Sequence, residues 1–295
     1  MGQEQNLDKI IKKIESLPTL PIISQKIIEL VGNENTTFKD LVLVIEKDQS
    51  LTLKLLKVAN SSFYSFLSKV TSLESALVKL GFNEVKSIVL GISVYRFFSD
   101  MNGDGFDRKR FWEHAIICSQ IAKYLNLHFR LPNDDSLFLS GLIHDMGKIV
   151  IDEYLHDEFV QIVETISTAR TTFSKAEKKI LGTTHYQISA KLLKQWKFPK
   201  KVIFQVLYHH APWYAKDFET NSIIIYLSNI LTKMAGYPSH PAERMLTPEE
   251  FIKSAEMEYI NKCGFELDHE TLRNLIHNIR EYIQDEADSV MRLLD

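Results

Sequence analysis

Apolar residues recur at helical spacing along almost the whole chain, and this pattern limits the protein to a small set of folds. Ile22, Ile23, Ile27, Ile28 and Val31 form one such stripe. Separations of three and four residues place side chains on one face of an α-helix. The two-residue alternation of a half-buried strand, bounded by turn residues, is hard to find. We therefore predict an all-α protein built from many helices.

Capping residues and prolines predict where several helices begin. Such starts are expected at Thr71 with Glu74, at Thr184 with Gln187, at Pro199 and at Thr247–Glu250. A Ser or Thr followed three residues later by Glu or Gln satisfies free backbone N–H groups, and proline fits the first turn. Gly81 is expected to end the helix that follows Thr71.

The chain divides into three predicted parts. Residues 1–105 form an amino-terminal helical lobe, residues 106–240 a second, metal-binding helical lobe, and residues 241–295 a helical extension. The segment MNGDG before the first boundary has the glycines and turn-forming residues of a linker or surface loop. The extension is acidic, with 13 acidic and 6 basic residues. Its apolar stripe around Leu275 either packs on the second lobe or forms a homodimer interface.

Charge and composition exclude several classes of protein. The net charge is −3, and the lysines are scattered along the helices rather than gathered on the basic face of a nucleic-acid-binding protein. No apolar run approaches the ~20 residues of a membrane span, and the amino terminus lacks a secretory signal pattern. Two cysteines without paired spacing, Cys118 and Cys263, fit a reducing compartment. We expect a cytoplasmic protein that binds neither nucleic acid nor a membrane.

The pair His144–Asp145 is the strongest chemical signal in the chain. It follows the segment LFLSGLI at 137–143, which is apolar on nearly every side. An unpaired carboxylate buried there would cost several kcal/mol or become protonated. Asp145 therefore requires a partner, and a bound cation is the natural candidate if histidines converge on it.

Four further histidines lie close to apolar stripes of predicted helices: His114, His185, His209 and His210. One histidine in such a place is more often a hydrogen-bonded core residue than a ligand, but several together would each need a separate partner. We therefore predict a metal site. Imidazole nitrogen and carboxylate oxygen suit iron, manganese, zinc or nickel. Cys118 is one turn from His114, although a single buried cysteine is more often an apolar filler than a ligand.

The order of these residues resembles a known superfamily. His114, then His144–Asp145 followed by Gly147–Lys148, then His185 and His209–His210 look like the HD superfamily of metal-dependent phosphohydrolases, over about residues 106–235. The amino-terminal segments LPTLP, DQSLTLKLLKVANSSFY and SLESALVKLG resemble the narrower HDOD family, the HD-related output domain of bacterial signalling proteins. Together the match spans about residues 16–235.

The resemblance implies a two-lobed, all-α domain that serves as an output or adaptor module in signal transduction, often with a degraded phosphohydrolase site. It implies that the metal positions of the superfamily correspond to His114, His144, Asp145, His185 and His209, with His210 as a less secure neighbour. In an active member, Asp145 and Lys148 would be catalytic, Lys148 by contacting phosphate. The alternative for Lys148 is a solvated side chain that complements a helix C-terminus.

Two positions depart from the pattern of catalytic relatives. Active HD proteins bring an aspartate to the metal from a late helix, and the nearest equivalent here is Asn229, a neutral and poorer ligand. The HD-GYP phosphodiesterases carry an acidic residue after the double histidine, where this chain has Ala211. The sequence Gly236–Tyr237–Pro238 lies further along and is interpreted as an ordinary turn.

We therefore expect a signalling output or adaptor module that presents a binding surface, with little or no catalysis. The alternatives are an active metal-dependent phosphohydrolase or nucleotide phosphodiesterase, and a structural helical protein without metal. A protein of a signalling pathway is the expected partner, and a phosphorylated or nucleotide-like small molecule stays open. Phe63, Tyr64 and Phe66 either anchor such a partner or pack between the lobes. Trp213 and Tyr214 are expected to border a pocket over the metal.

Overall fold

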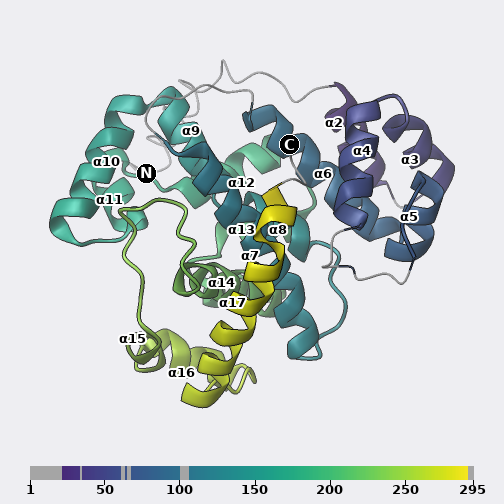
Figure 1. Cartoon of the computed structure of the whole chain (residues 1–295). Helices are drawn as coiled ribbons and strands as arrows, with labels where there is room; N and C mark the ends of the chain where they lie inside the picture. Colours follow the sequence, from purple (N-terminus) through teal and green to yellow (C-terminus); the bar gives the residue numbers. More distant parts are fainter. Residues whose placement is uncertain (1–21, 34, 61–63, 65–67, 100–105, 292–295) are drawn as a thin grey trace.

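The computed structural model describes residues 22–33, 35–60, 64, 68–99 and 106–291. Every regular element in these ranges is a helix (Figure 1). This confirms the predicted all-α fold. The LPTLP and MNGDG segments lie outside the described residues.

The amino-terminal lobe is built from helices α2 to α6. They are α2 (Ile22–Gly32), α3 (Phe38–Ile45), α4 (Gln49–Ala59), α5 (Leu73–Leu80) and α6 (Phe82–Ser99). The start of α5 corrects the prediction, because Ser72 rather than Thr71 caps the helix and Ser75 rather than Glu74 completes the reciprocal bonds. Gly81 follows the end of α5 as predicted, with a φ of 84° that suits glycine.

The second part of the chain surrounds two helices that cross closely, α7 and α8. Its elements are α7 (Arg108–His128), α8 (Leu137–Ile143), α9 (Met146–Tyr154), α10 (His156–Ala169), α11 (Phe173–Leu181), α12 (His185–Gln195), α13 (Lys200–Leu207), the 3-10 helices η1 (Pro212–Tyr214) and η2 (Lys216–Phe218), and α14 (Glu219–Met234). Gly141 of α8 lies directly on α7, where a Cβ atom would come within 2.6 Å of the Cα atom of Ser119. This contact brings the end of α8 close to the α7 residues that face it.

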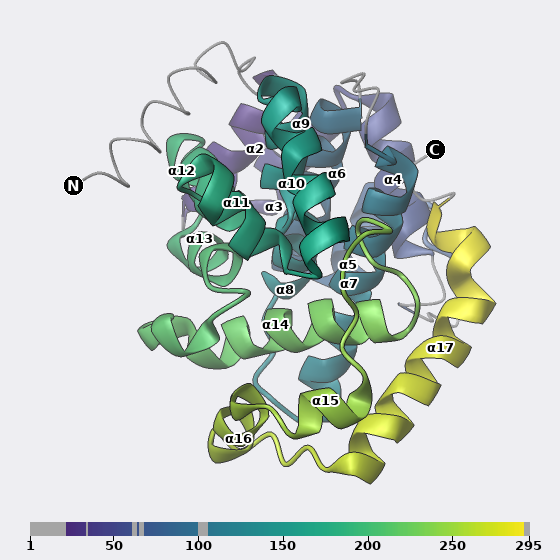
Figure 2. The same ribbon diagram turned by 90° about the vertical axis from the view of Figure 1, so that its left-hand side faces the viewer.

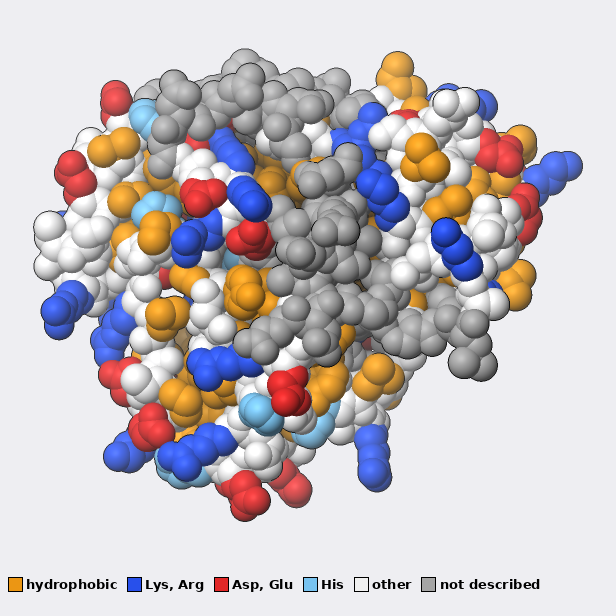
Figure 3. Space-filling model, in the orientation of Figure 1, with side chains coloured by type: hydrophobic (Ala, Val, Ile, Leu, Met, Phe, Trp, Pro, Cys, Tyr) orange, Lys and Arg blue, Asp and Glu red, His pale blue; other side chains and the backbone are white. Residues whose placement is uncertain are grey.

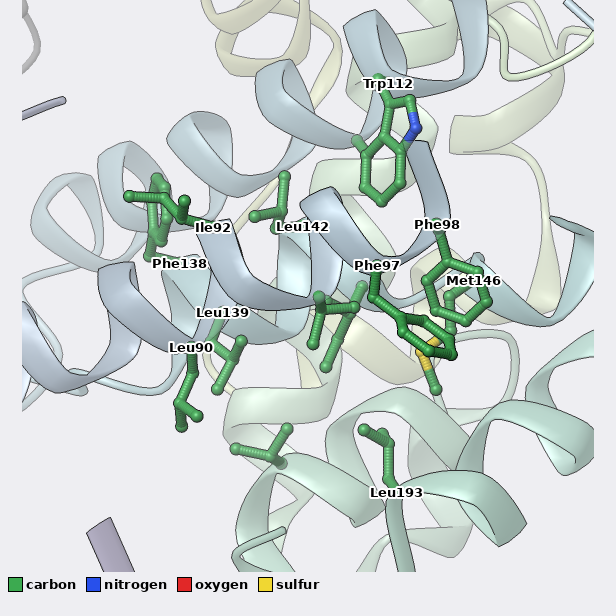
Figure 4. Close-up of a cluster of buried hydrophobic side chains, with 14 of the residues drawn as sticks. Leu90, Ile92, Phe97, Phe98, Trp112, Phe138, Leu139, Leu142, Met146 and Leu193 are labelled. Atoms are coloured by element: carbon green, nitrogen blue, oxygen red, sulfur yellow. The ribbon is translucent and has the colours of Figure 1, made fainter. Parts of the chain in front are cut away.

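Helix α6 joins the amino-terminal lobe to the second part. It is buried along most of its length, and Leu90 and Ile92 belong to the same hydrophobic core as Phe138 and Leu142 of α8 (Figure 4). Gly91 lies at this contact, since a Cβ atom there would be 2.8 Å from the Leu142 side chain. The two lobes therefore share one core.

The extension packs on the second part of the chain (Figure 2). Its helices are α15 (Pro248–Ile252), α16 (Ala255–Lys262) and α17 (His269–Met291). The capping box at Thr247 is confirmed, with Glu250 as its reciprocal partner. The apolar stripe of α17, which contains Leu272, Leu275, Ile279 and Ile283, lies in a second hydrophobic core with residues of α7 and α14. The stripe was predicted either to pack on the second lobe or to form a homodimer interface, and in the structure it packs within the chain.

The aromatic cluster near Tyr64 is described only in part. Phe63 and Phe66 lie outside the described residues. Tyr64 packs against the first hydrophobic core, and its hydroxyl donates a hydrogen bond of 2.6 Å to Glu84 Oε1 on α6. Tyr64 thus follows the packing alternative.

The surface carries both signs of charge. On the face shown in Figure 3, lysine and arginine side chains lie among aspartate and glutamate side chains. Among the described residues, no helix is both long enough and apolar enough to cross a bilayer.

Candidate metal centre

His144 and Asp145 lie at the junction of two buried helices. His144 is the C-cap of α8 and Asp145 the N-cap of α9. Both side chains are completely buried, and every residue of α8 is also buried. The sequence prediction that an acid and a histidine end a helix without a water-facing side is therefore confirmed.

The other histidines reach Asp145 from three directions. His114 lies in the second turn of α7 and His185 is the first residue of α12, and both are fully buried. The position of His209 corrects the prediction that the helix beginning at Pro199 carries it. Helix α13 ends at Leu207, and both His209 and His210 lie in the turn that follows. His209 is fully buried, whereas His210 is partly exposed.

These side chains form two groups that share Asp145. One contains Asp145, His185, His209 and His210, and the other contains His114, His144 and Asp145. Within each group the potential ligand atoms lie within 4.8 Å of one another. In the first group, Asp145 Oδ1 is 3.1 Å from His185 Nε2 and 3.4 Å from His209 Nε2. In the second, Asp145 Oδ2 is 3.5 Å from His144 Nε2.

Hydrogen bonds on the outer side of three rings determine where their protons lie. The Nδ1 atoms of His114, His144 and His209 face the backbone oxygens of Tyr237, Gly141 and Val206, each at 2.7 Å. A carbonyl oxygen only accepts, so Nδ1 carries the proton of each neutral ring and Nε2 keeps a lone pair. Burial lowers the pKa of His114 and of His209 to about 3, so these two rings are neutral at pH 7.

The Nε2 lone pairs of the neutral rings point into the site, where no hydrogen-bond donor of the described part of the chain faces them. The Nε2 atoms of His114 and His144 are 3.3 Å apart, and among the described residues His209 Nε2 has no hydrogen-bond partner. Lone pairs that face each other and a carboxylate repel until a cation accepts them. This donor set fits a divalent transition metal, and Asp145 is placed to ligate from both of its oxygens.

Glu177 orients His185, and the sequence reasoning missed it. Its carboxylate oxygens lie 2.9 and 2.8 Å from His185 Nδ1, and one of them accepts the backbone N–H of His185 at the start of α12. Burial alone would lower the pKa of His185, but the charges of Glu177 and Asp145 outweigh burial and raise it. A carboxylate behind a ligating histidine fixes the ring and increases its basicity.

Lys148 lies beside Asp145 and is completely buried. Its ammonium group donates to Asp145 Oδ2 at 2.7 Å, to Ser239 Oγ at 2.8 Å and to Glu243 Oε1 at 2.6 Å. The interpretation of Lys148 as a solvated lysine at a helix C-terminus is wrong, because it lies in the first turn of α9. Burial alone would raise the pKa of Asp145, but the ammonium group of Lys148, which donates to it, helps to hold that pKa well below its ordinary value.

Ser239, Glu243 and the carbonyl oxygen of Tyr237 also escaped the sequence reasoning. The Gly236–Tyr237–Pro238 turn interpreted as ordinary holds the ring of His114 through its backbone. Glu243 belongs to the segment predicted as an acidic extension, yet it is buried against Lys148. No local pattern marks any of the three, because each acts through a contact with a distant part of the chain.

Cys118 belongs to neither ligand group. Burial raises the pKa of the Cys118 thiol, which keeps it protonated as an apolar filler. Asn229 is buried on α14, and its Oδ1 atom has no hydrogen-bond partner within the described ranges. Trp213 packs against the rings of Tyr226 and Tyr259, whereas Tyr186 is the aromatic ring that contacts His185 and His210.

Glu177→Gln is expected to weaken metal binding by about 10- to 100-fold, since an amide orients His185 without adding to its basicity. The measurement is a competition titration with a chromophoric chelator. Glu164→Gln, an exchange at the exposed face of α10, is the control and should leave the affinity unchanged. Equal affinities for the Glu177 variant and the unmodified protein would show that this carboxylate has no influence on the metal.

The metal-free protein is expected to lose stability as the pH falls below 6.5. The folded pKa is lowered from 6.5 to about 3 for His114 and His209, so between these values the unfolded chain binds more protons. Each of these groups then removes about 1.4 kcal/mol per pH unit from the free energy of unfolding. His185 has a raised pKa, and its contribution, complete below pH 6.5, is lost above that value. Urea denaturation at pH 7.5 and pH 5 tests this, and equal midpoints would contradict it.

Comparison with known proteins places this arrangement in a family. The chain is 28% identical to the uncharacterized protein YuxH of Bacillus subtilis (strain 168) over 137 residues, which are 46% of this chain and 31% of YuxH. Among solved structures, a candidate phosphohydrolase from Shewanella amazonensis SB2B is 20% identical, with a TM-score of 0.74 and coverage of 97% of this chain and 98% of that one.

Two further solved structures share the fold. An HDOD domain protein of unknown function from Geobacter sulfurreducens is 21% identical, with a TM-score of 0.73 over 99% of this chain and 98% of that one. A candidate signal transduction protein from Marinobacter aquaeolei VT8 is 24% identical, with a TM-score of 0.73 over 100% of this chain and 66% of that one. The family model of the HDOD domain matches residues 17–212, more than half of the sequence, and the chain belongs to the HDOD family.

Proposed function

We propose that this protein is a signalling output or adaptor module in which a bound divalent metal braces the helical core and catalysis is weak or absent. Its metal would be held by His114, His144, Asp145, His185 and His209, with His210 at the partly exposed edge. The metal would supply a charge that ties together α7, the junction of α8 and α9, α12 and the turn after α13. The protein partner would then bind to the surface of this rigid core.

The engagement of Lys148 is the observation that carries the proposal. An ammonium group has three hydrogens, and here they go to Asp145, Ser239 and Glu243. A phosphate group would have to displace one of these partners. Glu243 is also anionic and buried next to Lys148, so it opposes the approach of a second anion.

Burial of the ligands points the same way. The side chains of His114, His144, Asp145, His185 and His209 have no solvent exposure. A hydrolase must admit both a phosphate ester and a water molecule to its metal. Asn229 further leaves the late helix α14 with a neutral side chain, so less anionic charge is available to hold the metal and position a hydroxide.

The second candidate is an active metal-dependent phosphohydrolase, and the shared Asp145 favours it. Two ligand groups that meet at one carboxylate have the form of a site for two metal ions, which can stabilise both the attacking and the leaving oxygen of a phosphate ester. A solved neighbour with the same fold is a candidate metal-dependent phosphohydrolase from Shewanella amazonensis SB2B. Activity in this chain would require Glu243 to release Lys148.

Elemental analysis and a hydrolysis panel separate the two candidates. The purified protein is analysed for iron, manganese, zinc and nickel, and is then assayed with a phosphomonoester, nucleotides and cyclic dinucleotides in the presence of manganese or iron(II). We expect bound metal without turnover. Turnover that His144→Ala abolishes would establish the hydrolase, and protein that takes up no metal would contradict a metal-braced core.

A further inference from the structure

A cavity of about 480 Å³ lies where the amino-terminal lobe, α7 and α17 meet. None of the histidines of the metal centre lines it. Its walls come from α5 and α6, from α7 and the loop that follows it, and from α17, which packs beside α7 (Figure 1). Its volume falls in the range of about 300 to 1,000 Å³ that is typical of small-molecule sites.

A buried ion pair forms the polar part of the cavity wall. Glu84 is 3% exposed, and its carboxylate accepts 2.6 Å hydrogen bonds from the Tyr64 hydroxyl and from Lys123 Nζ. Burial raises the pKa of Tyr64 well above its ordinary value, and the charge of Glu84 adds to this effect. Tyr64 therefore remains a neutral donor that is already committed to Glu84.

Lys123 retains the capacity to bind a ligand. An ammonium group donates three hydrogen bonds, and within the described part of the chain Glu84 accepts the one that Lys123 makes. The Lys123 side chain is 13% exposed and lines the cavity. Two N–H groups are thus available to an acceptor that enters, in a place where its competition with water is reduced.

The rest of the wall combines aliphatic and aromatic side chains with the amides of Asn126, Asn133 and Asn278, and the formal charges of the whole wall balance. Aliphatic side chains from α7 and α17 line the cavity together with the rings of Tyr64, Tyr124 and Tyr282. The charged lining residues are Lys79, Lys123, Glu84 and Asp135, two of each sign. A ligand with a formal charge would find no net opposite charge to offset its desolvation, whereas a flat ring system can stack on tyrosine rings.

We propose that this cavity binds an uncharged, planar heteroaromatic molecule with a carbonyl oxygen that accepts a hydrogen bond from Lys123. The ligand would contact both lobes and the extension at once. Ile121, which lines the cavity, and His114, in the metal centre, lie seven residues apart on α7, about two helical turns. Binding would therefore depend on how α17 and the amino-terminal lobe are positioned relative to α7, the helix that carries the predicted metal ligand His114.

Titration of the full-length protein with three neutral probes tests the proposal. Lumichrome, 4-quinolone and hypoxanthine are each planar, uncharged and equipped with a ring carbonyl, and their binding is followed by fluorescence or calorimetry. At least one is expected to bind at one site per chain. Flavin mononucleotide has a related ring system but carries a phosphate, and we expect it to bind at least about ten-fold more weakly than lumichrome because the cavity offers no net positive charge.

Two pairs of variants locate the binding. Leu127 is 71% exposed at the cavity, so Leu127→Trp can fill the opening without disturbing the core and should weaken binding at least about ten-fold, whereas Leu127→Ala should change it less than about three-fold. Lys123→Met should weaken it about ten-fold through the lost hydrogen bond. Lys194→Met, at an exposed site on α12, is the control for removal of a lysine. Circular dichroism confirms that each variant is folded.

The proposal is overturned if none of the three probes binds saturably, if Leu127→Trp binds the probe as the unmodified protein does, or if flavin mononucleotide binds more tightly than lumichrome. These outcomes do not depend on metal content or on hydrolysis. Failure of the cavity proposal is therefore distinguishable from failure of the metal-braced signalling module.

Discussion

Asp145→Asn is expected to weaken metal binding at least about 100-fold while leaving the metal-free protein folded. The amide has nearly the same shape as the carboxylate but brings no charge to the two ligand groups that share this residue. Its oxygen can still accept from Lys148, which lies 2.7 Å from Oδ2. Its NH₂ group can donate to the lone pair of His209, which faces Oδ1.

The stability of the metal-free variant makes this prediction specific. A donor opposite this imidazole lone pair should relieve its repulsion, so metal-free Asp145→Asn should unfold at a urea concentration no lower than the metal-free unmodified protein. Elemental analysis after dialysis measures the metal. Asp152→Asn is the matched control, because Asp152 is buried on α9 and pairs with Arg108 outside the ligand groups. Asp145→Asn protein that retains its full metal content would show that the cluster is not the metal site.

Gly147→Ala is expected to lower the free energy of unfolding by about 3 kcal/mol or more, beyond the usual range for overpacking. A Cβ atom at this position would be 2.1 Å from the backbone oxygen of His185 and 2.8 Å from Ser189 Oγ. Because the close contact is with the backbone of His185, α12 can relieve it only by a shift that also moves His185. Metal affinity should therefore fall together with stability, as urea denaturation and chelator competition would show.

Gly91→Ala is the control that separates the effect of a steric clash with rigid backbone from the effect of replacing a helical glycine. A Cβ atom there would also be close to a neighbour, at 2.8 Å, but that neighbour is the end of the flexible Leu142 side chain. Leu142 can rotate, and alanine favours a helix over glycine by about 1 kcal/mol. The destabilisation by Gly91→Ala should thus be clearly smaller. Equal stabilities of Gly147→Ala and Gly91→Ala would show that α9 packs less closely on α12 than in the structure.

The inner part of the candidate site was predictable because each of its members is an ionisable residue in or next to an apolar helical pattern. His144 and Asp145 end a helix that is apolar on all sides, and His114 and His185 lie on apolar stripes. A polar group in an apolar periodic pattern must find a partner wherever the helix is placed. The predicted position of His209 was less accurate, since α13 ends two residues before His209 and helix ends are weakly marked in sequence.

The outer part of the site was not predictable. Glu177 lies in the segment FSKAEKKIL, where an acid among lysines is typical of a solvated helix face. Only the packing of α11 beside the start of α12 buries it against His185. Glu243 stands in an acidic segment far along the chain and is buried against Lys148. For both residues, the sequence pattern alone favoured exposure to water.

The order and spacing of residues along the chain were enough to predict a helical protein, the burial of histidines and an aspartate by its helices, and a resemblance to the HDOD family. These properties depend on the spacing of residues along a helix, which is a local quantity. The packing of the helices was needed to show that Glu177 orients His185, that all three hydrogens of the Lys148 ammonium group are used, and that a cavity forms between α7 and α17. These depend on contacts between segments far apart in the chain, and no periodic pattern encodes the angle or the distance at which two helices meet.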